Sequence, residues 1–356
     1  METYYSVIGI MSGTSLDGLD LAYCRFGKQG ENWNYQIINT TTIAYSAEWK
    51  NRLADAGSLT AIEFSLLHVD FGRYVGGCVT KFMGDNEIQA DFISSHGHTV
   101  FHRPEKNLSV QIGCGAAIAA ETQMKVICDF RSLDMAYKGQ GAPLVPLGDV
   151  LLFGQYDACL NIGGFANISY NLDKERIAYD ICPANMVLNN FAKKLNFEFD
   201  NGGEIARSGV RDSKLWKALA RLPFYALNPP KSLGKEWVDA EFLPLLYKHD
   251  LCNEDFLRTL TDHIAFEIAT EINKSGAKNV LVTGGGALNT FLVEQIEKSC
   301  NAIIEIPPTA VINYKEALIF AFLGVLRERN ENNCLKSVTG ALANNCGGAV
   351  YNGKIV

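Results

Sequence analysis

Small residues, hydroxyls and two carboxylates gather near the start of the chain, between two apolar runs. The segment GIMSGTSLDGLDLAYCRF occupies residues 9–26, and it suggests a β-hairpin with a polar tip. Backbone N–H groups and hydroxyls without bulky side chains let a phosphate oxygen approach the main chain. Asp17 and Asp20 would repel a bare phosphate, so they favour a Mg²⁺ ion, held partly through water, beside a nucleotide. An ordinary polar turn is the alternative, since Ser, Asp and Gly are common turn residues.

A second segment, NIGGFAN at residues 161–167, repeats this pattern without an acid. Gly163 and Gly164 form the expected tip, and Asn161 and Asn167 flank it. The segment therefore suggests a second phosphate cradle, although Gly-Gly is also an everyday hairpin turn.

A third glycine-rich segment, VTGGGALN at residues 282–289, closes an expected strand and opens an expected helix. The spacing of Gly284, Gly285 and Gly286 does not match the G-x-G-x-x-G pattern of dinucleotide sites. A flat surface for an adenine ring, ending at Asn289, fits these residues better.

Strands and helices alternate along the chain, which predicts an α/β fold. Two glycine-containing hairpins, one in each half, also suggest two related lobes facing one another. We expect helices at 59–83, 255–276 and 313–327, strands at 90–97 and 124–130, and a hairpin at 157–172.

Composition narrows the classes of protein that fit. The 356 residues are 47% hydrophobic and 20% charged, which suits two folded domains and argues against disorder. The net charge of −7 and the lack of a Lys/Arg cluster argue against nucleic acid or a membrane as partner. No apolar run suggests a membrane helix and the start does not resemble a signal peptide, so we expect a cytoplasmic protein.

Cysteine and histidine spacing indicates neither disulfides nor a metal centre. The ten cysteines are scattered without a C-x-x-C pair, as is typical of a reduced cytosolic protein. The histidines of SHGHTVFHRP (residues 95–104) lack the spacing of common zinc sites.

The three glycine-rich segments occur in the order found in the sugar kinase, heat-shock-protein-70 and actin superfamily. More narrowly, the sequence resembles the anhydro-N-acetylmuramic acid kinases nearly from end to end. The motifs that carry the resemblance are GIMSGTSLDGLD, SHGHTVFH, QIG, DFRSLDMAYKGQGAPLVP, NIGGFANI, YDICPANM, DNGGEIARSG, PPKSLGKEW, VTGGGALN and VTGA.

The resemblance implies a two-lobe, actin-like ATPase fold of the ribonuclease H-like type, with ATP in a central cleft between the lobes. We expect residues 1–120 plus 330–356 in the first lobe and 121–329 in the second. The two glycine-tipped hairpins would converge on one triphosphate.

The resemblance also implies a reaction. The family uses ATP, with Mg²⁺, to convert 1,6-anhydro-N-acetylmuramic acid to N-acetylmuramic acid 6-phosphate in cell-wall recycling. The acceptor O6 lies in an internal ether, so a base must act on water rather than on a sugar hydroxyl. A kinase for another sugar, or a nucleotide-dependent binding or chaperone ATPase, is the alternative.

Two acids are candidates for catalysis. Asp180 follows an expected strand and precedes Pro183, which suits the first turn of a helix, and the family has its catalytic Asp at this turn. Without the resemblance, Asp180 would be interpreted as a helix N-cap. Glu316, at the start of an apolar helix, would either assist the water or favour the helix dipole.

Other expected site residues divide between substrate and nucleotide. Arg131 suits the lactyl carboxylate of muramic acid, with a salt bridge to Asp129 or Asp134 as the alternative. His98 and Thr99, on an expected strand-end loop, are possible hydrogen-bond donors to the sugar, although His98 could equally be structural. The substrate set is His98, Thr99, Arg131, Asp134, Gln140 and Pro143. The ATP set is Ser12, Gly13, Thr14, Ser15, Leu16, Asp17, Gly18, Leu19, Asn161, Gly163, Gly164, Asn167, Gly284, Gly285, Gly286 and Asn289.

The sequence departs from the family pattern at Lys138, Leu233 and Lys235, where the family usually has Gly, Thr and Arg. These changes put substrate detail in doubt rather than the class of reaction. The partner expected is a small anhydro amino sugar, and the resemblance suggests a homodimer.

Overall fold

The computed structural model describes residues 3–354, which divide into two compact units. The first unit contains residues up to Leu152 and from Tyr314 onward, and the second contains Phe153–Asn313. This division differs from the expected boundaries at residues 120 and 330. Residues 126–128 pair within the first sheet and the helix beyond Tyr314 packs on that sheet, so both belong to the first unit.

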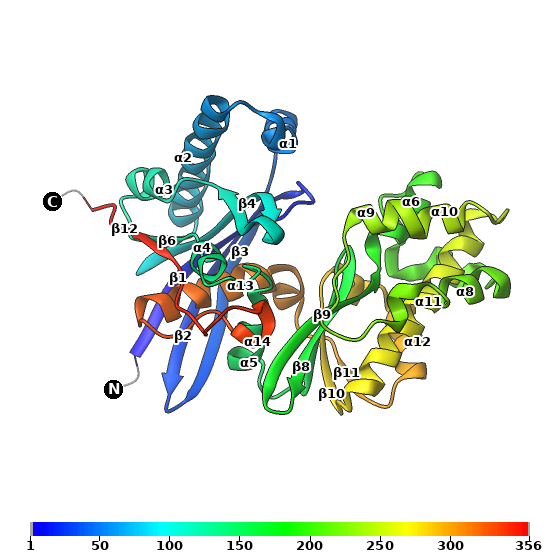
Figure 1. Cartoon of the computed structure of the whole chain (residues 1–356). Helices are drawn as coiled ribbons and strands as arrows, with labels where there is room; N and C mark the ends of the chain where they lie inside the picture. Colours follow the sequence, from blue (N-terminus) through cyan, green and yellow to red (C-terminus); the bar gives the residue numbers. More distant parts are fainter. Residues whose placement is uncertain (1–2, 355–356) are drawn as a thin grey trace. The chain divides into compact units, whose positions relative to one another are not determined.

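The first unit is built on a mixed sheet with the strand order β12-β6-β4-β1-β2-β3, to which β5 adds beside β4 (Figure 1). Its strands are β1 (Thr3–Ser12), β2 (Gly18–Gln29), β3 (Asn32–Ala44), β4 (Phe92–Arg103), β5 (Leu108–Ile112), β6 (Val126–Cys128) and β12 (Ala349–Tyr351). Its helices are α1 (Ala47–Ala54), α2 (Ala61–Asp85), α3 (Gly115–Thr122), α4 (Ser132–Ala136), α5 (Val145–Leu152) and α14 (Lys336–Thr339), with α13 (Thr309–Glu328) entering the unit at a break at Tyr314.

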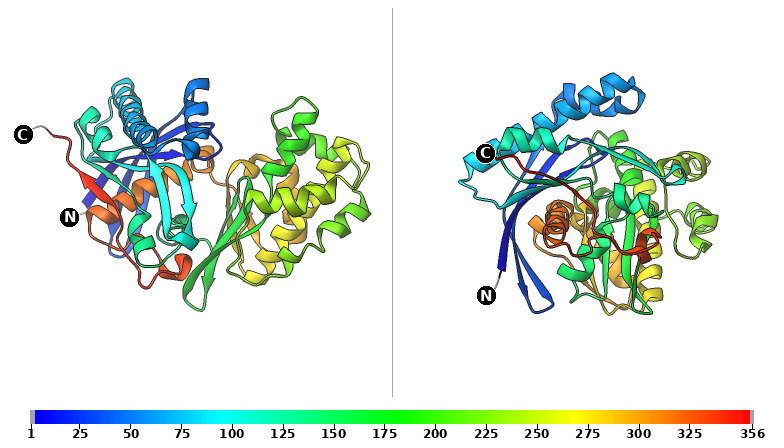
Figure 2. Two further views of the ribbon diagram at one scale, coloured as in Figure 1. Left: turned by 45° about the horizontal axis from the view of Figure 1, so that its top comes forward. Right: turned by 60° about the vertical axis from the view of Figure 1, so that its left-hand side comes forward.

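Helices cover both faces of this sheet, and the alternation of β1 decides which residue faces which helix. Ile8 and Ile10 belong to a buried cluster with Phe71 and Val75 of α2. Gly9 points the other way, where an added Cβ would lie 2.0 Å from the Ala317 carbonyl oxygen of α13. Figure 2 shows α2 and α13 on opposite faces of the sheet.

Helix α13 corrects one expectation. Among the described residues it is the one helix long and apolar enough to cross a membrane by length and composition. Most of it is buried, as in the core helix of a globular protein, and this burial accounts for its apolar sequence.

The second unit repeats the strand pattern of the first. Its sheet has the order β11-β10-β7-β8-β9, and β7-β8-β9 are antiparallel while β7-β10-β11 are parallel. In the first unit β1-β2-β3 are antiparallel and β1-β4-β6 are parallel, so the two sheets share one topology. The second set of strands is β7 (Ala158–Ile162), β8 (Phe165–Leu172), β9 (Glu175–Pro183), β10 (Asn279–Thr283) and β11 (Ile303–Glu305).

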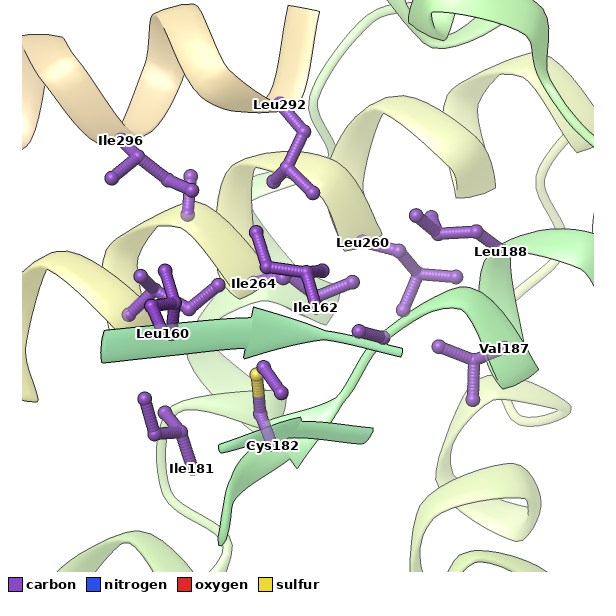
Figure 3. Packing of buried hydrophobic residues seen from close by; sticks show 14 of the residues in the cluster. Leu160, Ile162, Ile181, Cys182, Val187, Leu188, Leu260, Ile264, Leu292 and Ile296 are labelled. Atoms are coloured by element: carbon purple, nitrogen blue, oxygen red, sulfur yellow. The ribbon is translucent and has the colours of Figure 1, made fainter. Parts of the chain in front are cut away.

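Helices of the second unit bury the sheet residues next to its glycine-rich turns. They are α6 (Asn185–Lys194), α7 (Glu204–Ser208), α8 (Ser213–Leu219), α9 (Lys235–Trp237), α10 (Leu243–Leu246), α11 (Asn253–Ser275) and α12 (Thr290–Ser299). Figure 3 shows Leu160 and Ile162 of β7 beside Ile264 of α11, with Leu292 of α12 close by. Ile162 immediately precedes the Gly163-Gly164 turn, so this packing fixes one end of the turn.

The common topology of the two sheets confirms the expected α/β fold with two related, ribonuclease H-like halves. The expected helices and hairpin are present within a few residues of their expected ends, whereas the strand expected at 90–97 continues to Arg103 as β4. The helix expected to stop at Gly276 is α11, and Gly276 caps it with a left-handed φ of 70°.

Candidate functional site

The turn between β1 and β2 presents small polar groups to solvent. Thr14, Ser15 and Asp17 are exposed, and the Leu16 N–H donates to the Gly13 carbonyl across the turn at 3.3 Å. Leu16 has a φ of 60°, in the left-handed region that residues other than glycine rarely adopt. Exposed hydroxyls and main-chain N–H groups of this kind can bind a phosphate group, and phosphate binding by this turn stays a prediction.

Ser12 and His98 are buried and support this turn from inside the protein instead of facing solvent. The buried Ser12 hydroxyl lies 2.7 Å from the Tyr45 hydroxyl and 2.9 Å from Nδ1 of His98. Burial lowers the pKa of His98 to about 4, so its ring is neutral. His98 and Thr99 lie inside β4, and not on a strand-end loop as expected, because β5 pairs with this part of the strand.

Asp17 and Asp20 form an acceptor set that suits Mg²⁺. Desolvation raises the pKa of Asp20, a hydrogen bond from the Thr42 hydroxyl at 2.6 Å opposes the rise, and the charge of Asp17 adds to it. A bound cation would relieve the repulsion between these two carboxylates, and waters would complete its shell. Among residues 3–354, no group of three His, Cys, Asp or Glu residues forms a metal cage.

Arg131 is held by a histidine and a backbone carbonyl. Its Nε and Nη2 lie 3.1 and 2.8 Å from Nε2 of His96, and its Nη1 donates to the Gly141 carbonyl at 2.6 Å. Desolvation lowers the pKa of Arg131 to about 10, while Glu316 opposes the fall, so the guanidinium stays charged near neutral pH. Neither acidic partner considered from the sequence, Asp129 or Asp134, forms a salt bridge with Arg131 among those found in the described residues.

Asp134 organises the loop that follows Arg131. Its carboxylate is fully buried and accepts hydrogen bonds from the Gly141 N–H and from three side chains of the C-terminal segment, those of Cys334, Thr339 and Asn345. The carboxylate is therefore directed into the protein, which contradicts the expectation that Asp134 contacts the sugar.

The ordered loop leaves two of the expected site residues, Gln140 and Pro143, accessible. Gln140 is exposed, and its backbone N–H donates to the Thr339 carbonyl at 2.8 Å, while Pro143 follows a cis peptide bond and is also exposed. Lys138 adopts a φ of 65°, a conformation that the glycine usual in the family reaches without strain.

Glu316 lies within α13, after the break at Tyr314, and not at the first residues of the helix. Desolvation raises the pKa of the Glu316 carboxyl, Arg131 and Lys315 oppose the rise, and Asp20 adds to it. The first unit thus brings the charges of Asp20, Arg131 and Glu316 into one electrostatic group from three separate elements. Next to Glu316, Lys315 forms a buried ion pair with Asp149 of α5 at 2.7 Å.

In the second unit, the Gly163-Gly164 turn is tied to the start of α6. The Gly163 carbonyl accepts from the Asn185 N–H at 3.1 Å, and the Gly164 carbonyl accepts from the Ala184 N–H at 2.8 Å. Asn161 and Asn167 lie opposite each other in the β7–β8 register. The turn is therefore a fixed glycine surface, as a phosphate cradle requires.

The triple-glycine segment packs against this same hairpin. A Cβ on Gly284 would lie 2.7 Å from the Asn161 side chain and from the Ile162 carbonyl, and one on Gly286 would lie 2.2 Å from Ile162. Larger residues would force the two segments apart. The structure thus brings together two glycine-rich segments that the sequence separates.

Asn289 has a structural task at the end of the triple-glycine segment. It is buried, and its side chain caps α12 by accepting from the Leu292 N–H at 3.0 Å. A Cβ on Gly203 would lie 2.3 Å from the Asn289 side chain, so the DNGG segment at 200–203 lines the same region. The Asn289 side chain therefore has a structural role at the start of α12, and its contact with ATP stays a prediction.

Asp180 lies inside β9, which corrects its placement in the first turn of a helix or at an N-cap. The antiparallel pairing of β8 with β9 places Asp180 opposite Asn167 and carries the strand on to Pro183, so α6 starts only at Asn185. The Asp180 carboxylate accepts from the Leu233 N–H at 2.8 Å. Desolvation raises the pKa of Asp180, and this hydrogen bond limits the rise.

Three functional features escaped the sequence interpretation. His96 orients Arg131, Lys231 belongs to the segment that contacts Asp180, and Gly203 lies so close to Asn289 that a side chain would not fit between them. These three residues lie in the motifs SHGHTVFH, PPKSLGKEW and DNGGEIARSG. The resemblance of those motifs to the family was the only feature of the sequence that could have pointed to them.

Comparison with known proteins gives the family. The family model for anhydro-N-acetylmuramic acid kinase matches residues 5–353. The chain is 33% identical to an anhydro-N-acetylmuramic acid kinase of Bacillus cereus, over 94% of this chain and 96% of that protein. It is 35% identical to the enzyme of the same name from Sulfurovum sp. (strain NBC37-1), over 97% and 98% of the two chains.

Solved structures are more distant. A ROK family glucokinase from Streptomyces griseus, in complex with glucose and AMPPNP, is 12% identical, with a TM-score of 0.39 over 91% of this chain and 99% of that one. The activator of 2-hydroxyisocaproyl-CoA dehydratase from Clostridium difficile, with bound ADPNP, is 14% identical, with a TM-score of 0.42 over 92% and 97%.

The repeated sheet topology, with a glycine-tipped hairpin in each unit, is that of the actin-like ATPase fold, and the family model and the named relatives define the chain as a kinase with this fold. Such an enzyme is a phosphotransferase with an alcohol group as acceptor. Within this class, the chain belongs to the anhydro-N-acetylmuramic acid kinase family.

Proposed function

We propose that this chain uses ATP and water to convert 1,6-anhydro-N-acetylmuramic acid to N-acetylmuramic acid 6-phosphate, in the recycling of cell-wall peptidoglycan. Membership of the family over residues 5–353 supports the substrate and the reaction. The structural observation that carries the mechanism is the Asp180 carboxylate, which one backbone N–H holds through Oδ2.

Asp180 is the general base in this proposal. Its Oδ1 accepts a proton from the water that attacks the anomeric carbon, and a new bond forms between that carbon and the water oxygen. The bond from the anomeric carbon to O6 breaks, O6 attacks the γ-phosphorus of ATP, and ADP leaves with the electrons of the broken phosphoanhydride bond. Partial desolvation makes the carboxylate a stronger base than a free aspartate.

The β1–β2 turn and the Gly163-Gly164 turn would bind phosphate groups, and the Gly284–Gly286 surface would receive the adenine ring. Asp17 and Asp20 would hold Mg²⁺, largely through water, and a bound Mg²⁺ would neutralise charge on the phosphates. The main-chain N–H groups of the turns would orient the phosphate oxygens.

Arg131 is the proposed partner of the lactyl carboxylate of the sugar. After its hydrogen bonds to His96 and Gly141, the guanidinium has further N–H groups to donate. The remaining residues of the proposed sugar site, farther from the sugar than Arg131, would be His98, Thr99, Gln140 and Pro143. Glu316 would help orient the attacking water and balance the charge of Arg131.

The same proposal includes a cytoplasmic, homodimeric enzyme that binds neither nucleic acid nor membranes. The net charge of −7 supports the last two features.

Labelled water tests the reaction. The enzyme, MgATP and the anhydro sugar are incubated in H₂¹⁸O, and the product is identified by mass. We expect one ¹⁸O atom at the anomeric carbon and none in the transferred phosphoryl group. Unlabelled product incubated in H₂¹⁸O measures spontaneous exchange. A phosphorylated product that still contains the anhydro ring, or label in the phosphoryl group, would overturn the proposal.

A further inference from the structure

The carboxylate of Asp180 is held by a segment that has no regular secondary structure. Residues 231–233 contact Asp180 twice, because the Asp180 N–H donates to the Lys231 carbonyl at 3.1 Å and the Leu233 N–H donates to Oδ2 at 2.8 Å. Both contacts use backbone atoms, so the replacement of the usual Thr by Leu233 leaves them unchanged. The position of the carboxylate therefore depends on what fixes this segment.

The side chain of Lys231 fixes it from the inside. This side chain is only 3% exposed, and its Nζ lies 3.5 Å from Oε1 of Glu271 on α11. The ammonium group also lies 5.0 Å from the ring centre of Phe224 and 5.8 Å from that of Tyr179. A buried ammonium without such partners would be very costly, so these contacts define one position for Lys231.

Glu271, the anionic partner of Lys231, is itself held by hydrogen bonds. Glu271 accepts from the Tyr179 hydroxyl at 2.9 Å and from Lys274 at 3.0 Å. Tyr179 directly precedes Asp180 in β9. The Glu271 carboxylate therefore holds both the strand that contains Asp180 and the segment 231–233 that contacts Asp180. Glu267, one turn earlier on α11, is buried beside this group, and the charge of Lys231 acts on it as well.

We propose that Lys231 is a positioning residue for the catalytic base: its buried ion pair with Glu271 locks residues 231–233 and so aims the Asp180 carboxylate. The inference depends on the proposed role of Asp180. Lys231 does not contact substrate in this arrangement and acts only through the backbone of its own segment.

The physical reason is that one hydrogen bond ties this segment to the Asp180 backbone, and a second, from the Leu233 N–H, sets the direction of the carboxylate. If the segment loses its anchor, the Leu233 N–H no longer stays on Oδ2, and Asp180 samples other rotamers. Misplacement of a reacting group by about 1 Å can cost on the order of 100-fold in rate. Nucleotide binding is unaffected, because residues 231–233 contact neither glycine-rich turn through any hydrogen bond found in the described residues.

The test compares Lys231→Met with Lys274→Met. Both changes remove an ammonium partner of the same Glu271 oxygen, but Lys274 is mostly exposed and does not touch residues 231–233. Met keeps much of the length and apolar volume of Lys. We expect Lys231→Met to lower kcat by about 10- to 100-fold with the KM for MgATP within about twofold. Lys274→Met should retain kcat.

The pH profile separates positioning from stability. The Leu233 hydrogen bond favours the ionised carboxylate, so its loss raises the pKa of Asp180 and moves the acid limb of kcat to higher pH in Lys231→Met. The titratable groups of this buried cluster include Lys231, Glu267, Glu271, Cys182, Tyr179 and Tyr225, and Asp180→Asn is measured in parallel to assign the limb. An unshifted limb together with unchanged kcat would overturn the inference.

A second variant covers a failure of Lys231→Met to fold. Lys231→Met/Glu271→Leu removes both charges and leaves no unpaired buried ion from this pair. We expect the double variant to regain stability, measured by urea unfolding, while kcat stays low. Recovery of kcat together with stability would overturn the inference, because the pair would then be purely structural. An active Asp180→Asn would instead overturn the proposed base, and the positioning role with it.

Discussion

Arg131 donates through two of its nitrogens to a single acceptor, Nε2 of His96, at 3.1 and 2.8 Å. Nδ1 of the same ring lies 2.9 Å from the Gly97 carbonyl, so Nδ1 carries the hydrogen and Nε2 keeps its lone pair. Burial holds the pKa of His96 well below its usual range, and Arg131 adds to this effect. His96 therefore orients the Arg131 guanidinium as a neutral ring. It adds no positive charge that would offset the negative charge of Glu316.

His96→Phe should raise the KM for the sugar by about tenfold, because a half-buried guanidinium would lose its acceptor and its fixed direction. The KM for MgATP should not change. Steady-state kinetics with each substrate varied in turn provide the measurement. His249→Phe, in the second unit, is the control. Equal effects on both KM values would contradict an orienting role for His96.

Asp180→Asn should lower kcat by about 10³-fold while nucleotide and sugar still bind, because the amide accepts a proton poorly but keeps the shape of the side chain. Isothermal titration measures the binding, and a coupled ADP assay measures kcat. Asp173→Asn, in the exposed turn between β8 and β9, is the matched control. Substantial turnover by Asp180→Asn would remove this residue from the mechanism.

Gly9→Ala should destabilise the first unit by about 3 kcal/mol, because its Cβ would collide with the backbone of α13 at Ala317. Gly77→Ala, on α2, has no atom within 4 Å of the added Cβ and should be neutral or stabilising by about 1 kcal/mol. Urea unfolding monitored by circular dichroism compares the two. A similar midpoint for both variants would show that α13 does not pack as described.

Asp134→Asn should destabilise the protein by about 2 kcal/mol and raise the KM for the sugar. The amide would turn N–H groups toward donors that now share a carboxylate, among them Gly141 N–H and Thr339. Thermal unfolding and kinetics are the measurements, with Asp129→Asn on the exposed side as control. Full stability with a raised KM would indicate a direct sugar contact instead.

Glu267 makes stability depend on pH. Desolvation raises its pKa to about 7, Glu271 adds to the rise, and Lys231 and Lys274 oppose it. Because the folded-state pKa exceeds the unfolded value, the folded state binds more protons, and stability falls as pH rises from about 4.5 to 7. In Glu267→Gln, the fall in the free energy of unfolding with rising pH should be smaller by about 2 kcal/mol. Urea unfolding at pH 5 and pH 8 tests it, and an identical pH dependence in both proteins would refute it.

Local patterns predicted most of the fold, and they failed where pairing partners lie far away in the sequence. The apolar period and Gly276 located α11 closely. Nothing near Asp180 shows that β8 will extend β9 as far as Pro183, so a helix turn was a reasonable but wrong prediction. Likewise, β5 draws His98 into β4 and away from a loop.

Side-chain roles were harder to predict than positions. Asp134 and Asn289 have the residue types of ligand contacts, but the Asp134 carboxylate accepts from the distant C-terminal segment, and the Asn289 oxygen caps the helix that follows it. Lys231 attracted no prediction, because nothing local shows that its ammonium group is buried on Glu271. Tertiary packing decides such cases.

The shared order of the two sheets makes their residues comparable one by one. Asp20 is the third residue of β2 and pairs across the sheet with Thr42 of β3; Asn167 is the third residue of β8 and pairs with Asp180 of β9. Each half thus has one acid in the same cross-strand couple, but on opposite members of it. If one ancestral module was duplicated, a swap of acid between neighbouring strands would have placed the proposed metal ligand in one half and the proposed base in the other.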